Sequence, residues 1–285
     1  PVRLWLSLHD TTPSVVAERR AVYCHNPFPF YKWKMREWLF TPKIVMFALF
    51  SKYIYRTNIH KNQHVVVQQQ WFKDEFIRLF DLKPSSIVVA PPSTSEGIKK
   101  AVMQRETGEK YSFIYASSPN SHKNFECVCR AAEMLHAELG ASMPDIYITI
   151  KGNENKYAEW LYKNWGKRIP GLHFVGFLGK QSLYKYYKEC DCLIFPSKVE
   201  TWGLPISEFA AYDKPMLLAD LPYAHETASG AREVAFFDPE NSRELADMIC
   251  KLSAGDRSFL RSIDKLEISH PMATSWGGLF KLLLD

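Results

Sequence analysis

Short apolar runs alternate with helical patterns along most of this chain, and that alternation limits the fold more than any other feature. Parallel strands need long crossover connections that are usually helical, so this order predicts parallel sheets with helices on both faces. The predicted strands are Leu4–Leu8, Ala21–Cys24, Val65–Val67, Ile87–Ala90, Ser112–Tyr115, Ile146–Ile150, His173–Val175, Cys192–Phe195, Met216–Leu218 and Val234–Phe237. The main predicted helices are Phe125–Leu139, Tyr157–Trp165, Leu183–Glu189, Pro205–Ala211 and Ser242–Leu252.

A change in composition divides the chain into two predicted domains. Between residues 91 and 110 the sequence collects Pro, Ser, Gly and charged residues before a new strand begins. We expect a shortened or partial Rossmann-like domain over residues 1–108 and a complete one over residues 109–266. Residues 267–285 carry an amphipathic helical pattern from Pro271 to Leu284, and this helix is predicted to pack back toward the first domain.

Composition argues against several classes of protein. Apolar residues make up 46% and charged residues 24%, which is the balance of a soluble globular protein. No apolar run approaches the ~20 residues of a membrane-spanning helix, and the N-terminus lacks the features of a signal peptide. The six cysteines lack the spacing of a zinc site, which favours buried free thiols in a reducing cytosol. We therefore expect a cytoplasmic protein.

The segment PSKVETWGLPISEFAA, residues 196–211, carries the most specific chemical signal. It follows a predicted strand and leads into a helix, at the edge where open α/β sheets bind ligands. Gly203 permits a close backbone approach. The N–H groups of Gly203, Leu204 and Ile206, together with the helix dipole, would suit a phosphate.

Two carboxylates, Glu200 and Glu208, flank this turn. Carboxylates repel phosphate but accept hydrogen bonds from hydroxyl groups, so the pattern predicts a ligand with a sugar on each side of a diphosphate. Acidic residues near the start of a helix are also common for dipole reasons alone, and Glu208 by itself does not decide between these interpretations.

The complete phrase ETWGLPISE, residues 200–208, resembles the Glu-x7-Glu signature of retaining glycosyltransferases of the GT-B fold, family 4 or group 1. Further blocks in the same order resemble that family, including SSPNSHKNFECVCRAAEML at 117–135 and FFDPENSRELADMI at 236–249. The resemblance covers about residues 111–253 strongly. It implies two Rossmann-like domains that face a cleft, here with a short N-terminal one.

The resemblance also implies roles for individual residues of a donor site. Lys123 fits the family's phosphate-binding lysine, whereas Ser118 stands where the family usually carries an arginine. The positive charge would then rest on Lys123, helped by His122 or by backbone amides. The implied contacts to the donor sugar, the ribose and the base come from the following residues: Glu200, Thr201, Gly203 and Leu204 for the sugar or phosphate, Glu208 for the ribose, and Phe177 and Leu178 for the base.

The first half resembles the family's acceptor domain less specifically. His25 follows a predicted strand and is our candidate for the histidine near the donor sugar and the acceptor hydroxyl, so we predict that His25 and Glu200 are catalytic. His9 and Asn26 are assigned to the acceptor side. A structural loop histidine is the alternative for both His9 and His25. The segment VVVQQQWFKDEFIRLF, residues 65–80, resembles a strand and helix of the family that would place Gln69 or Gln70 at the cleft edge.

The implied activity is retaining transfer of a hexosyl or deoxyhexosyl group from a GDP- or UDP-linked sugar. The acceptor would be a hydroxyl of a glycan or lipid-linked glycan in surface polysaccharide synthesis. The family needs no metal, and the sequence has no Asp-x-Asp motif in a suitable loop, so we expect no metal and no other cofactor. The alternative is a GT-B protein that binds nucleotide-sugar without transferring it, which Ser118 and the short first half would explain. Nucleic-acid binding is disfavoured because the basic residues form no known motif.

Residues 31–61 combine Lys and Arg with aromatic side chains and contain one acidic residue, Glu37. Such a segment fits an interfacial surface, and a lipid-linked acceptor on the inner face of the membrane would explain it. A helix with solvated Lys and Arg over an aromatic core fits equally well. The first interpretation predicts a peripheral membrane protein.

Overall fold

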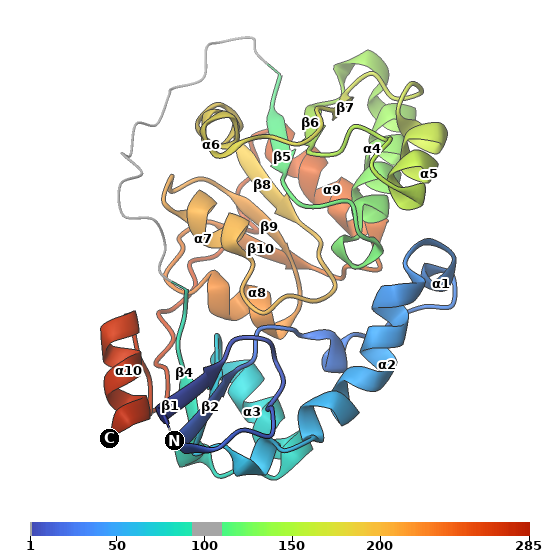
Figure 1. The fold of residues 1–285 in the computed structure, drawn as a ribbon. Helices are drawn as coiled ribbons and strands as arrows, with labels where there is room; N and C mark the ends of the chain where they lie inside the picture. The colour runs from blue at the N-terminus through green and yellow to red at the C-terminus, as the bar shows by residue number, and fades with distance from the viewer. Residues whose placement is uncertain (1, 93–109) are drawn as a thin grey trace.

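Two parallel sheets organise the computed structural model, which describes residues 2–92 and 110–285 (Figure 1). The first sheet has the strand order β1-β2-β3-β4, and the second has the order β10-β9-β8-β5-β6-β7. All strand pairs in both sheets are parallel, which confirms the predicted α/β class. The predicted domain boundary, between residues 108 and 109, lies outside the described residues.

The first unit surrounds the smaller sheet. Its strands are β1 (Val2–Ser7), β2 (Ala17–Tyr23), β3 (His64–Val67) and β4 (Ile87–Val89). Its α-helices are α1 (Glu37–Phe40), α2 (Pro42–Arg56) and α3 (Gln70–Phe80), and its short 3-10 turns are η1 (Phe28–Phe30), η2 (Ile59–Lys61) and η3 (Pro84–Ser86). Helix α2 lies within residues 31–61, for which a helix was one of the two interpretations, although it was not among the main predicted helices.

The second unit surrounds the larger sheet, with helices on both faces (Figure 1). Its strands are β5 (Ser112–Tyr115), β6 (Asp145–Ile148), β7 (Leu172–Phe174), β8 (Cys192–Phe195), β9 (Met216–Ala219) and β10 (Val234–Phe237). Its helices are α4 (Phe125–Leu139), α5 (Lys156–Trp165), α6 (Lys180–Glu189), α7 (Leu204–Ala210), α8 (Pro222–Thr227) and α9 (Ser242–Ser253), with turns η4 (Ser121–Lys123) and η5 (Gly140–Ser142). Each strand predicted from the sequence overlaps one of the ten observed strands. All six cysteines are free, and five are buried.

The C-terminal helix α10 (Trp276–Leu284) packs against the first sheet (Figure 1). Side chains of a strand alternate between the two faces of a sheet, and Val66 of β3 accordingly joins a cluster with Leu279 and Leu283 of α10. Its neighbours Val65 and Val67 face the opposite core, which includes the aromatic side chains of α3. Helix α10 therefore covers one face of the first sheet.

The predicted start of the last helix, at Pro271, was wrong by one turn or more. The backbone of residues 271–273 instead lies beside β4, where Ala273 N donates to Val89 O at 2.9 Å and Val89 N donates to Pro271 O at 3.0 Å. Ser275 then caps the helix by accepting a hydrogen bond from Gly278 N at 3.1 Å. The cap sets the start, because the preceding backbone groups are already paired with the strand.

The two units are joined at the N-terminus of α3, which has no capping side chain of its own. Both oxygens of Glu226, at the end of α8, accept hydrogen bonds from this terminus: Gln70 N at 2.5 Å and Trp71 N at 3.0 Å. Beside them, Gln69 Nε2 donates to Thr227 Oγ1 at 2.7 Å. A carboxylate of the second unit thus caps a helix of the first.

Candidate active site

A cavity of about 380 Å³ lies where both units meet at the carboxyl ends of β5 and β8. This is the point where the order of the second sheet changes direction, and such points bind ligands in open α/β folds. From the first unit the wall includes Tyr23, His25, Gln68 and Pro92. From the second unit it includes Ala116, Ser117, Lys123, Phe195, Glu200, Thr201, Trp202, Gly203, Leu204 and Pro205.

The turn before α7 is shaped by Gly203, whose φ is 86°. An L side chain rarely adopts this conformation, and a Cβ atom here would also lie 3.2 Å from Cδ1 of Ile206. The glycine therefore lets the chain turn from the cavity wall into α7, which begins at the next residue. The expectation that the N–H of Ile206 is available for phosphate was wrong, because it donates to Gly203 O at 2.9 Å.

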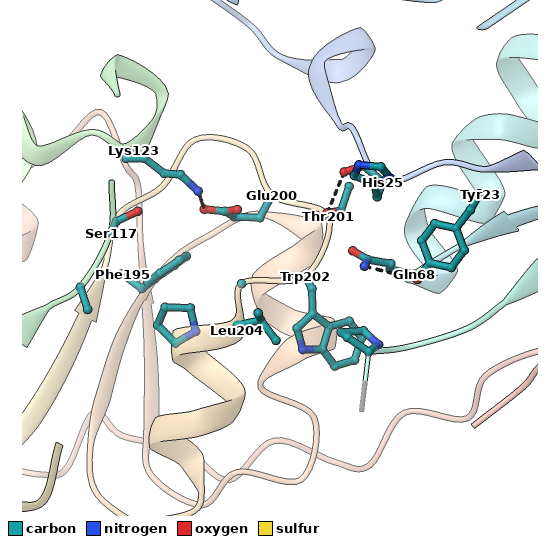
Figure 2. A pocket seen from close by; sticks show the side chains of 14 residues that line it. Tyr23, His25, Gln68, Ser117, Lys123, Phe195, Glu200, Thr201, Trp202 and Leu204 are labelled. Atoms are coloured by element: carbon teal, nitrogen blue, oxygen red, sulfur yellow. Dashed lines mark hydrogen bonds and ion pairs between the residues drawn. The ribbon is translucent and has the colours of Figure 1, made fainter. Parts of the chain in front are cut away.

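Lys123 and Glu200 form an ion pair inside the cavity, with Lys123 Nζ 2.5 Å from Glu200 Oε1 (Figure 2). Their side chains are only 17% and 14% exposed. Lys123 ends η4 and its backbone oxygen accepts a hydrogen bond from Tyr115 of β5, which fixes the start of the lysine side chain. The pair places one positive and one negative charge side by side in the cavity wall.

His25 lines the same cavity from the first unit and lies beside Thr201 (Figure 2). Its backbone N–H donates to Asp10 Oδ1 at 2.7 Å, and its ring Nδ1 lies 3.6 Å from the same oxygen. Tyr55 of α2 donates its hydroxyl to that oxygen at 2.9 Å. The backbone oxygen of His25 accepts a hydrogen bond from Thr201 Oγ1 at 3.2 Å, so the loop is tied to both units.

Six of the predicted site residues lie together in the cavity wall: His25, Lys123, Glu200, Thr201, Gly203 and Leu204. Six others are not part of that wall: His9, Asn26, Ser118, Phe177, Leu178 and Glu208. Ser117 occupies the wall in place of its exposed neighbour Ser118.

The predicted residues outside the cavity wall lie elsewhere in the structure. His9 lies exposed in the turn after β1, and Asn26 accepts a hydrogen bond from Phe28 N at 3.1 Å. Phe177 is 89% exposed beside Leu178 in the turn before α6. Glu208 is half-buried inside α7, where burial raises the pKa of its carboxyl and Lys180 opposes that rise. Phe177, Leu178 and Glu208 thus lie near the start of α6 and outside the cavity.

Two expectations about supporting residues were wrong. His122 adds no positive charge beside Lys123, because its side chain is buried and burial together with the neighbouring lysine lowers the pKa of its ring to about 3. The cleft-edge glutamine is Gln68, whereas Gln69 is buried against Thr227 and Gln70 accepts a hydrogen bond from Ser269 N at 3.0 Å.

Sequence reasoning also missed Tyr23, Gln68 and Trp202. Gln68 Nε2 lies 3.4 Å from the Tyr23 hydroxyl, so these two polar groups of the first unit meet in the wall (Figure 2). Gln68 is the first polar residue after β3, and that position was the signal that could have identified it. Tyr23 had no such signal, since it reads as an ordinary strand residue.

Residues 2–92 and 110–285 contain no group of three His, Cys, Asp or Glu side chains placed to hold a metal ion. The same residues contain no helix that is long and apolar enough to cross a bilayer. Metal independence and the absence of a cofactor stay predictions.

The amino-acid sequence is similar to those of two bacterial mannosyltransferases. The chain is 21% identical to O-antigen chain mannosyltransferase RfbU of Salmonella typhimurium over 86% of its own length and 64% of that protein. It is 26% identical to serotype-specific mannosyltransferase WbdA of Escherichia coli over 57% of its length and 20% of that protein. The chain thus spans less than two thirds of each of these relatives.

Among solved structures, the fold is similar to that of a mutant of S. aureus TarM in complex with fondaparinux, alpha-GlcNAc-glycerol and UDP. The TM-score is 0.61 at 16% identity, over 84% of this chain and 44% of TarM. This likeness, with the two parallel sheets, confirms the predicted GT-B fold. Residues 98–263, more than half of the chain, match the family model of the glycosyl transferases group 1, and the chain belongs to that family of glycosyltransferases.

Proposed function

We propose that this glycosyltransferase moves a hexosyl group from a nucleotide-sugar to a hydroxyl of a glycan or lipid-linked glycan in surface polysaccharide synthesis, with retention at the anomeric carbon. The observation that carries the proposal is the shared cavity, which is lined by His25 of one unit and by Lys123 and Glu200 of the other. One cation, one carboxylate and one histidine around a pocket suit a diphosphate, sugar hydroxyls and an acceptor hydroxyl, in that order.

The donor is proposed to extend from this cavity toward α6. Lys123 would hold the diphosphate, and Glu200, Thr201 and the N–H groups of Gly203 and Leu204 would contact the sugar. Glu208 and the turn at Phe177 and Leu178 would contact the ribose and base. Their position supports this orientation: Lys180, the first residue of α6, acts on the pKa of Glu208, so both ends of the nucleoside site lie close together.

The chemistry follows from the charges in the cavity. The bond from the anomeric carbon to the diphosphate would break while the acceptor oxygen bonds to the same face, and the acceptor proton would pass to the departing phosphate oxygen. Lys123 would stabilise the negative charge on the leaving group. Glu200 is the one carboxylate among the described residues that line this cavity, and it is assigned above to the hydroxyl groups of the donor sugar. This favours front-face transfer over a covalent intermediate on a carboxylate. Since Lys123 would stabilise the leaving group, we propose that transfer needs no metal.

The names of RfbU and WbdA favour mannose as the transferred hexose, carried by GDP or UDP. The first test is a thermal-shift screen with GDP, UDP, GDP-mannose, UDP-glucose and UDP-GlcNAc on the wild type and Lys123→Ala. Binding to the native state raises stability by RT ln(1 + [L]/Kd), about 2.7 kcal/mol at 100 times Kd. A shift with one nucleotide that is lost in Lys123→Ala supports the site, and no shift with any of them contradicts it.

A second test separates transfer from binding alone. NMR of the product formed from the selected donor would report the anomeric configuration, with EDTA present in a parallel reaction. Retention and unchanged turnover in EDTA are expected. Donor binding without turnover on glycan or polyprenyl-linked acceptors would favour the alternative, a nucleotide-sugar-binding protein. That alternative is favoured by Ser118, which leaves Lys123 as the single Lys or Arg among the described residues of the cavity wall.

We also propose that α2 contacts the inner membrane face from the cytoplasm. Its outer face exposes five large apolar side chains at helical spacing, flanked by Lys43, Lys52 and Arg56: Met46, Leu49, Phe50, Tyr53 and Ile54. An apolar stripe between cations matches an anionic lipid surface. The rest of residues 31–61 has another role, because Lys34 and Arg36 pair with Glu240 and Glu126 of the second unit.

Sedimentation with phosphatidylglycerol vesicles tests this face. Binding is expected to fall in Leu49→Ser/Phe50→Ser and at high salt, and to be weak with phosphatidylcholine. The matched control is Val16→Ser, which removes another exposed apolar side chain, in the loop before β2. Equal binding of the α2 variant and the control would refute the proposal.

A further inference from the structure

The cation of the proposed donor site is already occupied by a side chain of the protein. Lys123 Nζ contacts Glu200 Oε1 at 2.5 Å, and both side chains are largely shielded from solvent. Ser118 supplies no charge, and no other Lys or Arg occurs among the described residues that line the cavity. A nucleoside diphosphate that enters this site therefore meets a lysine whose charge is neutralised and a carboxylate that repels it.

We propose that Glu200 selects for sugar-bearing nucleotides by occupying the diphosphate position of Lys123 until a donor sugar draws it away. This inference rests on the donor site proposed above. Removing a carboxylate from a shielded ion pair is costly unless new hydrogen bonds replace the lost ones. The hydroxyl groups of a donor sugar supply such hydrogen bonds to Glu200. GDP and UDP lack the donor sugar, and their ribose hydroxyls are assigned to Glu208, so they supply none to Glu200.

Contacts of the residues on both sides of Glu200 hold its turn in place, next to Lys123 and the proposed donor sugar. On one side Lys198 is fixed by Glu37 at 3.0 Å and Glu240 at 3.1 Å. On the other side Thr201 donates to His25 O at 3.2 Å. The side chains of Lys198 and Thr201 thus tie the turn to the first unit on both sides of Glu200, and we expect the Glu200 side chain to be the part that changes partners. The intact donor should therefore bind well. After transfer, Glu200 should return to Lys123 and favour release of the nucleoside diphosphate product.

Calorimetric titration with GDP, UDP, GDP-mannose and UDP-GlcNAc tests this role on four proteins: wild type, Glu200→Gln, Lys123→Ala and the double variant. We expect Glu200→Gln to bind the sugar-free nucleotide at least tenfold more tightly than wild type, while its affinity for the nucleotide-sugar rises much less. The preference of wild type for the sugar-bearing form should disappear. Glu159→Gln is the control, because it removes an exposed carboxylate of α5 that lies outside the cavity wall and does not contact Lys123, and it should leave both affinities unchanged.

The double variant separates a direct contact from a general effect of charge. If Glu200 acts by occupying Lys123, the gain from Glu200→Gln disappears in the Lys123→Ala background. A gain that persists there, or a Glu200→Gln variant that binds the sugar-free nucleotide no better than wild type, overturns the inference while leaving the donor site intact. Failure of all four proteins to bind any of the nucleotides overturns the donor site itself and the inference with it.

Discussion

The carboxylate of Glu226 that caps α3 across the two units gives a quantitative test of how they are joined. Glu226→Ala would leave Gln70 N and Trp71 N without their acceptors at a helix end that has no other capping side chain. Loss of a helix cap costs about 0.5–2 kcal/mol, and unsatisfied buried donors cost about 1–3 kcal/mol. With two N–H groups involved and Glu226 only 8% exposed, we expect a loss of about 2–3 kcal/mol.

Glu226→Gln should lose less than Glu226→Ala. Burial raises the pKa of the Glu226 carboxyl, although the N–H groups of Gln70 and Trp71 lower it. The negative charge of Glu226 therefore stabilises the helix terminus little more than a neutral acceptor would, and glutamine keeps one oxygen that can accept a hydrogen bond there. The order of stability should be wild type, then Gln, then Ala.

Differential scanning calorimetry is the assay. For a chain of this size about 1 kcal/mol corresponds to about 2–4 °C in Tm, so Glu226→Ala should melt roughly 4–12 °C below wild type. The matched control is Glu159→Ala, an exposed carboxylate in the first turn of α5, which should change stability by about 0.5 kcal/mol or less. If Glu226→Ala has the same Tm as Glu159→Ala, the cap does not join the units as described.

Three further predictions concern the site and its pH dependence. Gly203→Ala should destabilise the protein by about 1–3 kcal/mol and weaken donor binding, because φ is 86° there and the new Cβ would press on Ile206; chemical denaturation and calorimetry measure both. His25→Ala should lower kcat by about 10²-fold while donor affinity is kept, because the acceptor hydroxyl loses a group that positions it, and an equal kcat would remove His25 from the reaction. Folding raises the pKa of Glu226, so the folded state binds a proton more readily than the unfolded state. The free energy of unfolding of wild type, relative to that of Glu226→Gln, should therefore rise as the pH is lowered from 7 to 4.5. A decrease over this range would contradict the raised pKa.

The strands and the donor turn were predictable because their signals are local. Cys192–Phe195 is apolar throughout, and the chain must turn after it, so a strand followed by a ligand-binding turn was expected. The polar residue Gln68 was misplaced by one or two positions because the end of β3 sets which glutamine faces the cavity. A single residue of register decides that direction in a strand.

Contacts between the units were not predictable from local patterns. His122 precedes a lysine in the sequence, which suggested a second cation, but Phe28 and Tyr31 of the first unit pack on its ring and help to keep it neutral. Residues 31–61 looked like one basic surface, yet Lys34 and Arg36 meet carboxylates more than 80 residues away in the chain. Such pairings depend on how the two sheets are placed, and sequence periodicity does not contain that information.

The position of α10 has a consequence for the order in which the chain folds during synthesis. The second unit is continuous in sequence up to α9, so its core can close as soon as that segment has left the ribosome. The core of the first sheet cannot close at that stage. Val66 and Ala21 pack against Leu279 and Leu283, and these two residues follow the whole second unit in the chain. One apolar face of β2 and β3 must stay uncovered while the entire second unit is being made, and that face is where a chaperone would be needed most.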